Sequence, residues 1–268
     1  EAGYNVGTYT SPYIVRFNER ITYNYNDISN DELLKYINEV KILHDQVLQS
    51  HNDVITFFEL VTLVSFMFFR DLKVDYVVCE VGLGGLLDAT NVVQPLITAI
   101  TSISFDHMGV LGNTLEEIAL NKLGIVKNKA PLVTAVQDED LLELFKNYCA
   151  KKESELIVLD DNLITNITYG SQTNFKYKEE QYSITMLGTH QVRNACLSLE
   201  IIHKLQAMNK LKIEQKDIVQ GLFNTYWPGR MERFGNVILD GAHNVGGVTV
   251  LKDSMNVLFK DHYIKVLF

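Results

Sequence analysis

The sequence predicts an α/β protein in which helices flank a mostly parallel sheet. As far as residue 159, short runs of β-branched and aromatic residues alternate with longer segments of helical periodicity, the pattern of strands joined by crossover helices. Polar and glycine residues directly follow several strand-like runs, as expected where loops leave the carboxyl edge of such a sheet. The 268 residues are 47% hydrophobic and 21% charged, which is typical of a globular chain.

The strand at 74–79 is the element around which we expect the sheet to form. Its Val, Tyr and Cys residues are typical of a strand buried on both faces. Glu80 and the glycine loop 82–85 follow it, and glycines there let backbone N–H groups approach a ligand closely. Glu80 is therefore either a metal or ligand contact or a solvated loop carboxylate, and this stretch alone leaves both open.

The other elements of the first 159 residues can be taken in chain order. A strand at 6–10 leads into the Ser11-Pro12 turn, where the proline stops further pairing. A capping box at 114–117 opens a helix that Gly124 ends. The further expected elements are helices at 31–49, 56–69 and 139–152 and strands at 96–103, 131–136 and 156–159.

The pattern changes after residue 163. Between 164 and 187, polar and apolar residues alternate, which predicts a small antiparallel side sheet. A helix at 192–205 follows, and Pro228-Gly229 indicates a linker. A strand at 237–240 and a helix at 248–259 then predict the start of a second α/β domain. We expect domains at 1–228 and 229–268.

Charge and cysteine content exclude several classes of protein. A net charge of −9 argues against sequence-independent nucleic-acid binding, which needs a basic surface. The three cysteines are far apart in the sequence, so neither a disulfide framework nor a zinc site is expected, and a reducing cytoplasm is the default location. The most apolar window, 54–69, contains Glu59 and is short for a bilayer span, so no membrane association is expected.

A set of short motifs, taken together, resembles the folylpolyglutamate synthase and dihydrofolate synthase family of the Mur ligase superfamily. Each motif is weak alone, but their order and spacing match over nearly the whole chain. They are Thr10-Ser11-Pro12, Thr56-Phe57-Phe58-Glu59, Glu80-Val81-Gly82-Leu83-Gly84-Gly85, Leu87-Asp88-Ala89-Thr90-Asn91, Asp106-His107, 111–119, Lys122, His190-Gln191, Asn194-Ala195, Pro228-Gly229-Arg230 and Asp240-Gly241-Ala242-His243-Asn244.

The resemblance implies a P-loop ATPase domain and an ATP-dependent ligase that joins a folate or dihydropteroate carboxylate to the amine of L-glutamate through an acyl phosphate. It implies Mg²⁺, with a monovalent cation as an open addition, and a monomeric protein. Magnesium and cationic side chains would stabilise charge on the transferred phosphoryl group.

The resemblance also assigns roles to particular residues. Lys122, His107 and Glu80 would be catalytic, with Lys122 open to carbamylation if its pKa is lowered. The other assignments are Ser11, Glu80 and His107 to the metal; Asn194, Arg230, Asp240 and His243 to the nucleotide; and Thr56, Phe57, Phe58, Glu59, Leu87, Asp88 and Ala89 to the pterin side of the substrate.

Departures from the family pattern lead us to expect a fragment. The family's glycine-rich phosphate loop lies upstream of the Ser11-Pro12 turn, and its C-terminal domain extends beyond residue 268. Leu86 stands where the family usually has arginine, and Tyr13 where it usually has histidine. We therefore expect no turnover by this chain as given, and turnover once those parts are supplied.

Two other functions are open at this stage. One is a different Mur-type amino-acid ligase, such as a peptidoglycan-precursor enzyme. The other is a non-catalytic nucleotide-binding α/β protein that uses the glycine loop 82–85. The dinucleotide fingerprint requires GxGxxG between a strand and a helix, and residues 81–86 do not match it.

Overall fold

The computed structural model describes residues 1–51 and 53–267, and its chain divides into two compact units. The smaller unit is Gly3–Gln94. The larger unit comprises Glu1–Ala2 and Pro95–Phe268. Each unit is described by itself below. The predicted α/β class is confirmed, with a parallel sheet, flanking helices and a small antiparallel sheet. The predicted domain boundary at 228/229 stays a prediction.

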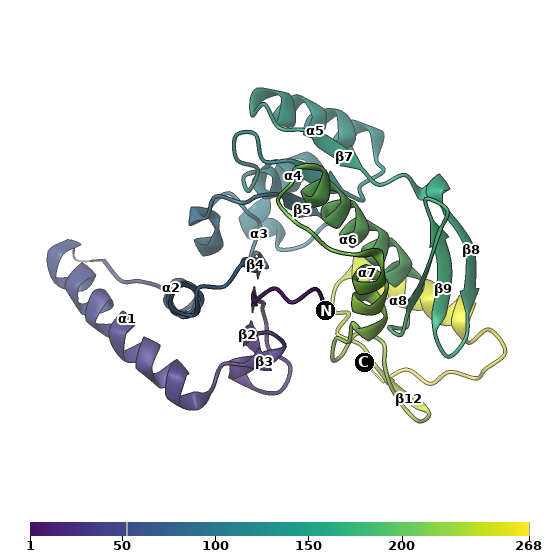
Figure 1. The fold of residues 1–268 in the computed structure, drawn as a ribbon, viewed down its shortest axis with the longest axis horizontal. Helices are drawn as coiled ribbons and strands as arrows, with labels where there is room; N and C mark the ends of the chain where they lie inside the picture. The colour runs from purple at the N-terminus through teal and green to yellow at the C-terminus, as the bar shows by residue number, and fades with distance from the viewer. Residues whose placement is uncertain (52, 268) are drawn as a thin grey trace. The chain divides into compact units, whose positions relative to one another are not determined.

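The smaller unit is a mixed four-stranded sheet with two helices packed together (Figure 1). The strand order is β3-β2-β1-β4, in which β1 pairs antiparallel with β2 and parallel with β4. Its elements are β1 (Val6–Tyr9), η1 (Phe17–Arg20), β2 (Ile21–Tyr23), β3 (Asn26–Asp27), α1 (Asn30–His51), α2 (Phe57–Leu72), β4 (Tyr76–Cys79) and η2 (Ala89–Val92).

The core of the smaller unit forms where β1 and β2 meet the apolar faces of α1 and α2. Tyr9 and Ile21 are fully buried and pack with Tyr36 and Phe68. The Tyr9 hydroxyl lies 3.1 Å from Thr62 Oγ1, which in turn donates to the Phe58 carbonyl at 2.8 Å. This pairing satisfies a buried phenol inside an otherwise apolar cluster.

The expectation that the strand at 74–79 is buried on both faces is wrong. In β4, Val77 and Val78 are exposed. The reason is its place in the sheet, because β4 is an edge strand with β1 as its one hydrogen-bonded neighbour among the described strands.

The Tyr9–Thr62 pair gives a test of the smaller unit's core. We expect Thr62→Val to lower the free energy of unfolding by about 1–3 kcal/mol, because the shape is kept while a buried hydroxyl loses its partner. Tyr9→Phe combined with Thr62→Val should lose less than the sum of the two single changes, because no polar group is then left unpaired. Urea unfolding measures all three variants, and strictly additive losses would contradict the pairing.

The larger unit contains the predicted side sheet and a parallel sheet made from three of the predicted strands, those at 96–103, 131–136 and 156–159. The strand at 74–79, around which this sheet was expected to form, belongs instead to the mixed sheet of the smaller unit. Its elements are β5 (Thr98–Ile100), α3 (Met108–Leu111), α4 (Leu115–Leu123), β6 (Leu132–Thr134), α5 (Glu139–Lys151), β7 (Leu156–Val158), η3 (Asp161–Leu163), β8 (Ile164–Tyr169), β9 (Thr173–Tyr177), β10 (Glu180–Ile184), α6 (Thr189–Ala207), α7 (Gln215–Asn224), β11 (Glu232–Phe234), β12 (Val237–Leu239) and α8 (Val245–Leu258).

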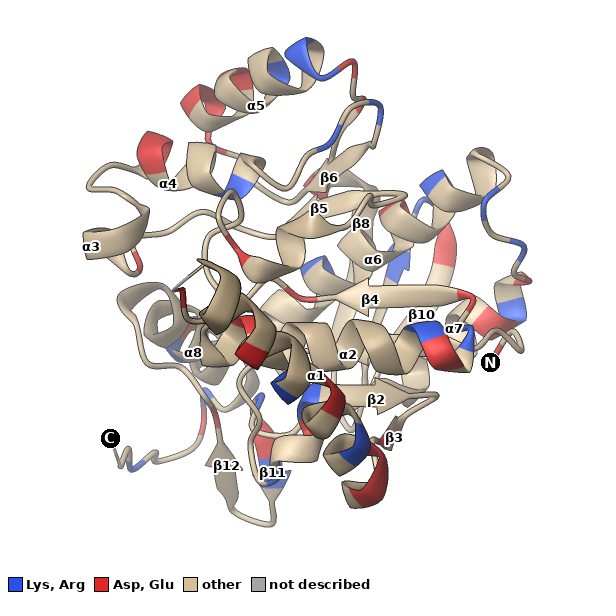
Figure 2. Ribbon diagram, turned by 90° about the vertical axis from the view of Figure 1, so that its left-hand side faces the viewer, with Lys and Arg blue, Asp and Glu red and all other residues tan. Residues whose placement is uncertain are grey.

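Strands β5, β6 and β7 form a parallel sheet in that order, with α4 and α5 packed together beside it. Helix α5 begins with the cap Asp138, whose carboxylate accepts from Leu141 N at 3.0 Å. Its first turn carries Glu139 and Asp140 and its last turn Lys151, the arrangement that the helix dipole favours (Figure 2). Phe145 of the same helix is fully buried in the core.

The capping box predicted at 114–117 is half present. Thr114 Oγ1 accepts from Glu117 N at 3.2 Å, as expected. The Glu117 carboxylate, however, accepts from Asn113 N at 2.6 Å and not from the amide of Thr114. Gly112, with φ of 129°, lets Glu117 approach, because a Cβ on Gly112 would lie 2.4 Å from Glu117 Cβ. The predicted helix end at Gly124 is confirmed.

The side sheet β10-β9-β8 is antiparallel and packs through β9 on α6 and through β10 on α7. Helix α8, yellow in Figure 1, packs against α6. The strand predicted at 237–240 forms, but it pairs antiparallel with β11. Near the N-terminus, Asn224 Nδ2 donates to Glu1 Oε1 at 2.7 Å. Over residues 1–51 and 53–267, no helix combines the length and the apolar character that a membrane crossing requires.

Candidate functional site

In the smaller unit, two predicted metal contacts lie together. The backbone N–H of Ser11 donates to Glu80 Oε2 at 2.7 Å, and Glu80 N donates to the carbonyl of Tyr9 at 2.9 Å. The parallel pairing of β1 with β4 explains this, because both strands end at the same edge and deliver their following residues side by side. The Glu80 side chain is exposed, so its carboxylate is accessible to a cation.

The glycine loop 82–85, which follows Glu80, is stabilised by Asp88. Its carboxylate accepts from Leu83 N at 2.9 Å and from Thr90 N at 3.0 Å. Phe58 covers the loop at Gly82, where an added Cβ would lie 2.4 Å from the Phe58 ring. The predicted substrate residues Phe58 and Asp88 therefore border one loop, with Leu87 beside them and 90% exposed.

The other predicted substrate residues have different surroundings. Phe57 packs near Phe17, with ring centroids 6.1 Å apart, and lines an apolar cavity of about 350 Å³ between α1 and α2. Thr56 and Glu59 form a capping box at the start of α2, in which Glu59 Oε2 accepts from Thr56 N at 2.8 Å and Glu59 N donates to Thr56 Oγ1 at 3.3 Å. Glu59 is exposed and paired through this cap. Ala89 begins η2 directly after Asp88.

In the larger unit, the loop after β5 is organised by Asp106. Its Oδ1 accepts from the backbone N–H of His107 at 2.9 Å, and its Oδ2 accepts from Asn244 Nδ2 at 2.9 Å. His107 has a left-handed backbone, with φ of 46°, and its side chain is 56% exposed. Asp106 thus fixes the residue that is predicted to contact the metal.

Lys122 lies on α4 within electrostatic reach of Asp106. Burial lowers the pKa of Lys122 because it disfavours the ammonium form, while the negative charge of Asp106 opposes that shift. Such an amine is more readily neutral than an exposed one. Neutral amines are the form that reacts with CO₂, so the environment suits the carbamylation that the family resemblance implies.

The predicted nucleotide residues come from the start of α6 and from the β11–β12 region. Asp240 holds the turn before β11, with Oδ2 accepting from Met231 N at 2.9 Å and Oδ1 from Ala242 N at 2.8 Å. Arg230 is exposed and lies over Gly241, where an added Cβ would be 3.6 Å from its guanidinium. Exposed His243 pairs through Nδ1 with the Gly241 carbonyl at 2.9 Å.

Helix α6 presents three polar side chains near its start. Asn194 is exposed and donates to Gln191 Oε1 at 3.1 Å. The buried Nδ1 of His190 has no partner among the described residues. Burial lowers the pKa of His190. The negative charge of Asp240 opposes this shift, and the positive charge of Arg230 adds to it. The beginning of α6 and the Arg230–Asp240 turn therefore face a common place in the larger unit.

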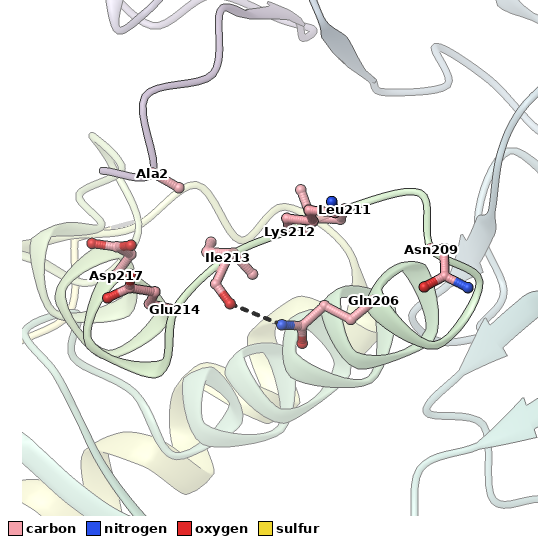
Figure 3. A pocket seen from close by; sticks show the side chains of 8 residues that line it. All are labelled: Ala2, Gln206, Asn209, Leu211, Lys212, Ile213, Glu214 and Asp217. Atoms are coloured by element: carbon pink, nitrogen blue, oxygen red, sulfur yellow. Dashed lines mark hydrogen bonds between the residues drawn. The ribbon is translucent and has the colours of Figure 1, made fainter.

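The cavity of about 540 Å³ in the larger unit is a different place. It is lined by Ala2, Gln206, Asn209, Leu211, Lys212, Ile213, Glu214 and Asp217, as Figure 3 shows. Gln206 lies near the end of α6, where its side chain donates to the Ile213 carbonyl at 2.9 Å. At 1.5 Å per residue, Asn194 and Gln206 are about 18 Å apart along the helix, so this cavity does not belong to the predicted site.

The sequence matches that of known proteins over its full length. Residues 32–202 match the Mur ligase middle domain. The chain belongs to the Mur ligase middle-domain family. Within this family, it is 40% identical over 279 aligned residues to the dihydrofolate synthase/folylpolyglutamate synthase of Bacillus subtilis, a match that covers 100% of the chain and 65% of that relative. The chain thus spans just under two thirds of that relative's length.

Solved structures of Mur ligase relatives have the same fold. A folylpolyglutamate synthase in complex with AMPPCP and folate superposes with a TM-score of 0.90 and 29% identity, over 96% of this chain and 66% of that one. The folylpolyglutamate synthase of Thermotoga maritima superposes with a TM-score of 0.83 and 34% identity, over 97% of this chain and 62% of that one.

The structure therefore groups the predicted residues into two sets. Ser11 joins Glu80 in the smaller unit, while Lys122 and His107 lie about Asp106 in the larger unit. Among residues 1–51 and 53–267, no three His, Cys, Asp or Glu side chains gather closely enough to hold a metal ion. The predicted metal set contains a serine and is drawn from both units, so its assembly stays a prediction.

Sequence reasoning did not assign Asp106 and Asn244 to the site. Both stand in recognised motifs, next to His107 and His243. Their hydrogen bond spans 138 residues of sequence, and neither motif indicates the other as its partner. The available signal was the chemistry of the pair, a carboxylate and an amide directly following two expected strands.

The lowered pKa of Lys122 leads to a spectroscopic test. A lower pKa means that the amine loses its proton at a lower pH, so at pH 8 a larger fraction is neutral than in a solvent-exposed lysine. In ¹³C-bicarbonate at pH 8, we expect a carbamate signal in ¹³C NMR that Lys122→Arg removes. Lys146→Arg, at a side chain that is 74% exposed, is the matched control and should keep the signal. A signal that survives Lys122→Arg would contradict the assignment.

Proposed function

We propose that this Mur ligase chain works in the ATP-dependent joining of L-glutamate to a folate or dihydropteroate carboxylate. The observation that supports it most is the grouping in the larger unit, where the family's His107, Lys122, Arg230 and Asp240 positions lie around two loops tied by Asp106 and Asn244. The 40% identity to a dihydrofolate synthase/folylpolyglutamate synthase supports the proposed substrate class.

The chemistry requires two anions to be held together. A phosphoryl group passes from ATP to the substrate carboxylate, the glutamate amine attacks the acyl phosphate, and inorganic phosphate leaves as the amide forms. Exposed Arg230 would offset charge on the nucleotide phosphates, and the amide of exposed Asn194 would bind the adenine or ribose. Asp240 would keep Arg230 in position through its hydrogen bond to Met231 N.

The donor chemistry of the predicted metal set fits Mg²⁺. A carboxylate oxygen from Glu80, a hydroxyl from Ser11 and a nitrogen from His107 form a sparse set, and magnesium usually keeps several waters and substrate oxygens. When bound, Mg²⁺ would neutralise charge on the phosphates. Carbamylated Lys122 would add a negative charge that supports the cation. The protein is proposed to act as a monomer, with a monovalent cation as an open addition.

The pterin end of the substrate is proposed to lie against Phe58 and the glycine loop. Phe58 offers an aromatic face next to Gly82, and exposed Leu87 extends the apolar surface. Both carboxylate oxygens of Asp88 accept hydrogen bonds from backbone N–H groups, those of Leu83 and Thr90. Its proposed part is to hold the loop in place for the ring.

Paired aromatic substitutions test this pocket. We expect Phe58→Leu to weaken binding of dihydropteroate by about 1 kcal/mol, or about fivefold in Kd, because ring stacking is lost. Phe57→Leu is the matched control on the same helix, and its effect should be smaller because Phe57 packs near Phe17. Calorimetric titration measures both. An equal loss in the two variants would place the ring elsewhere.

A chimera tests the reaction itself. The chain is joined to those parts of the Bacillus subtilis relative that lie outside the match, and ATP-dependent incorporation of labelled glutamate is measured with dihydropteroate and with tetrahydrofolate. We expect incorporation that needs ATP and one of the two pteroates, and a loss of about 100-fold or more on Lys122→Ala, as for removal of a charged group that acts on phosphoryl transfer.

Two outcomes would contradict the proposed function. Failure of the chimera to attach glutamate to any pteroate would refute the assignment. Binding of UDP-linked peptides in preference to pteroates would favour another Mur-type amino-acid ligase. A folding control by circular dichroism separates an inactive chimera from an unfolded one.

A further inference from the structure

The carboxylate of Asp106 joins two loops of the larger unit. One loop, 104–107, follows β5 and carries His107. The other, 240–244, follows β12 and carries His243 and Asn244. Asn244 Nδ2 donates to Asp106 Oδ2 at 2.9 Å, while Asp106 Oδ1 accepts from His107 N at 2.9 Å. A single carboxylate therefore fixes the backbone of one loop and the side chain of the other.

Both polar atoms of the Asn244 side-chain amide make hydrogen bonds. Its Oδ1 accepts from Gly247 N at 2.8 Å and so caps the start of α8. The first turn of α8 also lies on the first loop, because a Cβ added at Gly246 would be 3.5 Å from Ser104 Cβ and Oγ. The amide thus transmits the position of Asp106 to the first turn of α8 through one rigid side chain.

The second loop leads directly to the proposed nucleotide residues. Asp240, four residues before Asn244, holds the turn of Arg230 through Met231 N, and Gly241 N donates to the Gly229 carbonyl at 2.8 Å. A shift of Asn244 would therefore move the segment that positions Arg230. On the other side, a shift of Asp106 would move His107, whose left-handed backbone donates to the Asp106 carboxylate.

We propose that Asp106 and Asn244 are positioning residues, and that their hydrogen bond couples the loop proposed to hold the cation to the loop proposed to hold the nucleotide. This inference rests on the proposed function. In thermodynamic terms, bound Mg²⁺ raises the affinity for a nucleotide, and a bound nucleotide raises the affinity for Mg²⁺ by the same factor. Part of that factor is carried by one amide–carboxylate contact.

A reciprocal exchange of the two side chains tests the contact. Asn244→Asp keeps the cap of α8 but places two carboxylates opposite each other. Asp106→Asn leaves one oxygen for two donors. The double variant, Asp106→Asn with Asn244→Asp, restores a donor and an acceptor with their roles reversed and keeps an oxygen for His107 N. A purely local effect of either residue would not be repaired by the exchange.

Amide hydrogen exchange on the chain measures the contact without any ligand. We expect faster exchange at Gly247 in Asp106→Asn and at His107 in Asn244→Asp, because each amide belongs to the loop that was not changed. Both rates should return toward their original values in the double variant. Unchanged exchange at Gly247 in Asp106→Asn would show that the two loops are not linked and would overturn the inference.

The coupling is measured on the chimera described above, by titrating AMPPCP with and without MgCl₂. We expect each single variant to lower the Mg²⁺-dependent gain in AMPPCP affinity about fivefold or more, over and above any change of the affinity in EDTA, and the double variant to restore the gain. A residue that merely stabilises the fold would change both affinities together. Normal AMPPCP binding with an undiminished gain in the single variants would refute the inference and leave the proposed function intact, whereas a chimera that binds neither probe would refute both.

Discussion

A carboxylate in the loop after a parallel strand lies beyond the hydrogen-bond ladder of the sheet. Its oxygens must therefore find donors in the loops around it. In the larger unit, Asp106 meets this constraint with one donor from its own loop and one from Asn244. The loop after β5, the loop after β12 and the start of α8 take their positions from these two contacts. Lys122 lies in the field of the same charge. The arrangement of the proposed chemistry in this unit therefore depends on one half-buried acid in a loop.

The acids of the other motifs follow the same rule. Glu80 accepts from Ser11 N, Asp88 from Leu83 N, and Asp240 from Met231 N. Asp88 and Asp240 each anchor a turn that contains glycine or a left-handed residue, and Glu80 anchors the Ser11-Pro12 turn. In all three turns the backbone donors would otherwise lack partners within the sheet. The residues that mark a Mur ligase are thus also the residues that shape its strand-end loops. Removing one of them would change the structure of its loop.

The sequence was most informative where a periodic pattern is long. The helix expected at 31–49 is α1, that at 139–152 is α5, and the alternation at 164–187 is the antiparallel side sheet. Short elements were less predictable, because their environment decides them. The exposure of Val78 follows from the place of β4 at a sheet edge, and the partner of β12 is the unpredicted strand β11. Neither the exposure of Val78 nor the pairing of β12 can be predicted from the local sequence pattern.

The capping box of Thr56 and Glu59 has a consequence for how ancestry is judged in this superfamily. Both residues stabilise the first turn of α2 through their contacts with each other. Selection for a correctly capped helix alone can therefore preserve Thr56 and Glu59 in a related enzyme that has changed its substrate. Phe58, which closes over Gly82 and takes no part in the cap, is the better place to look for such a divergence.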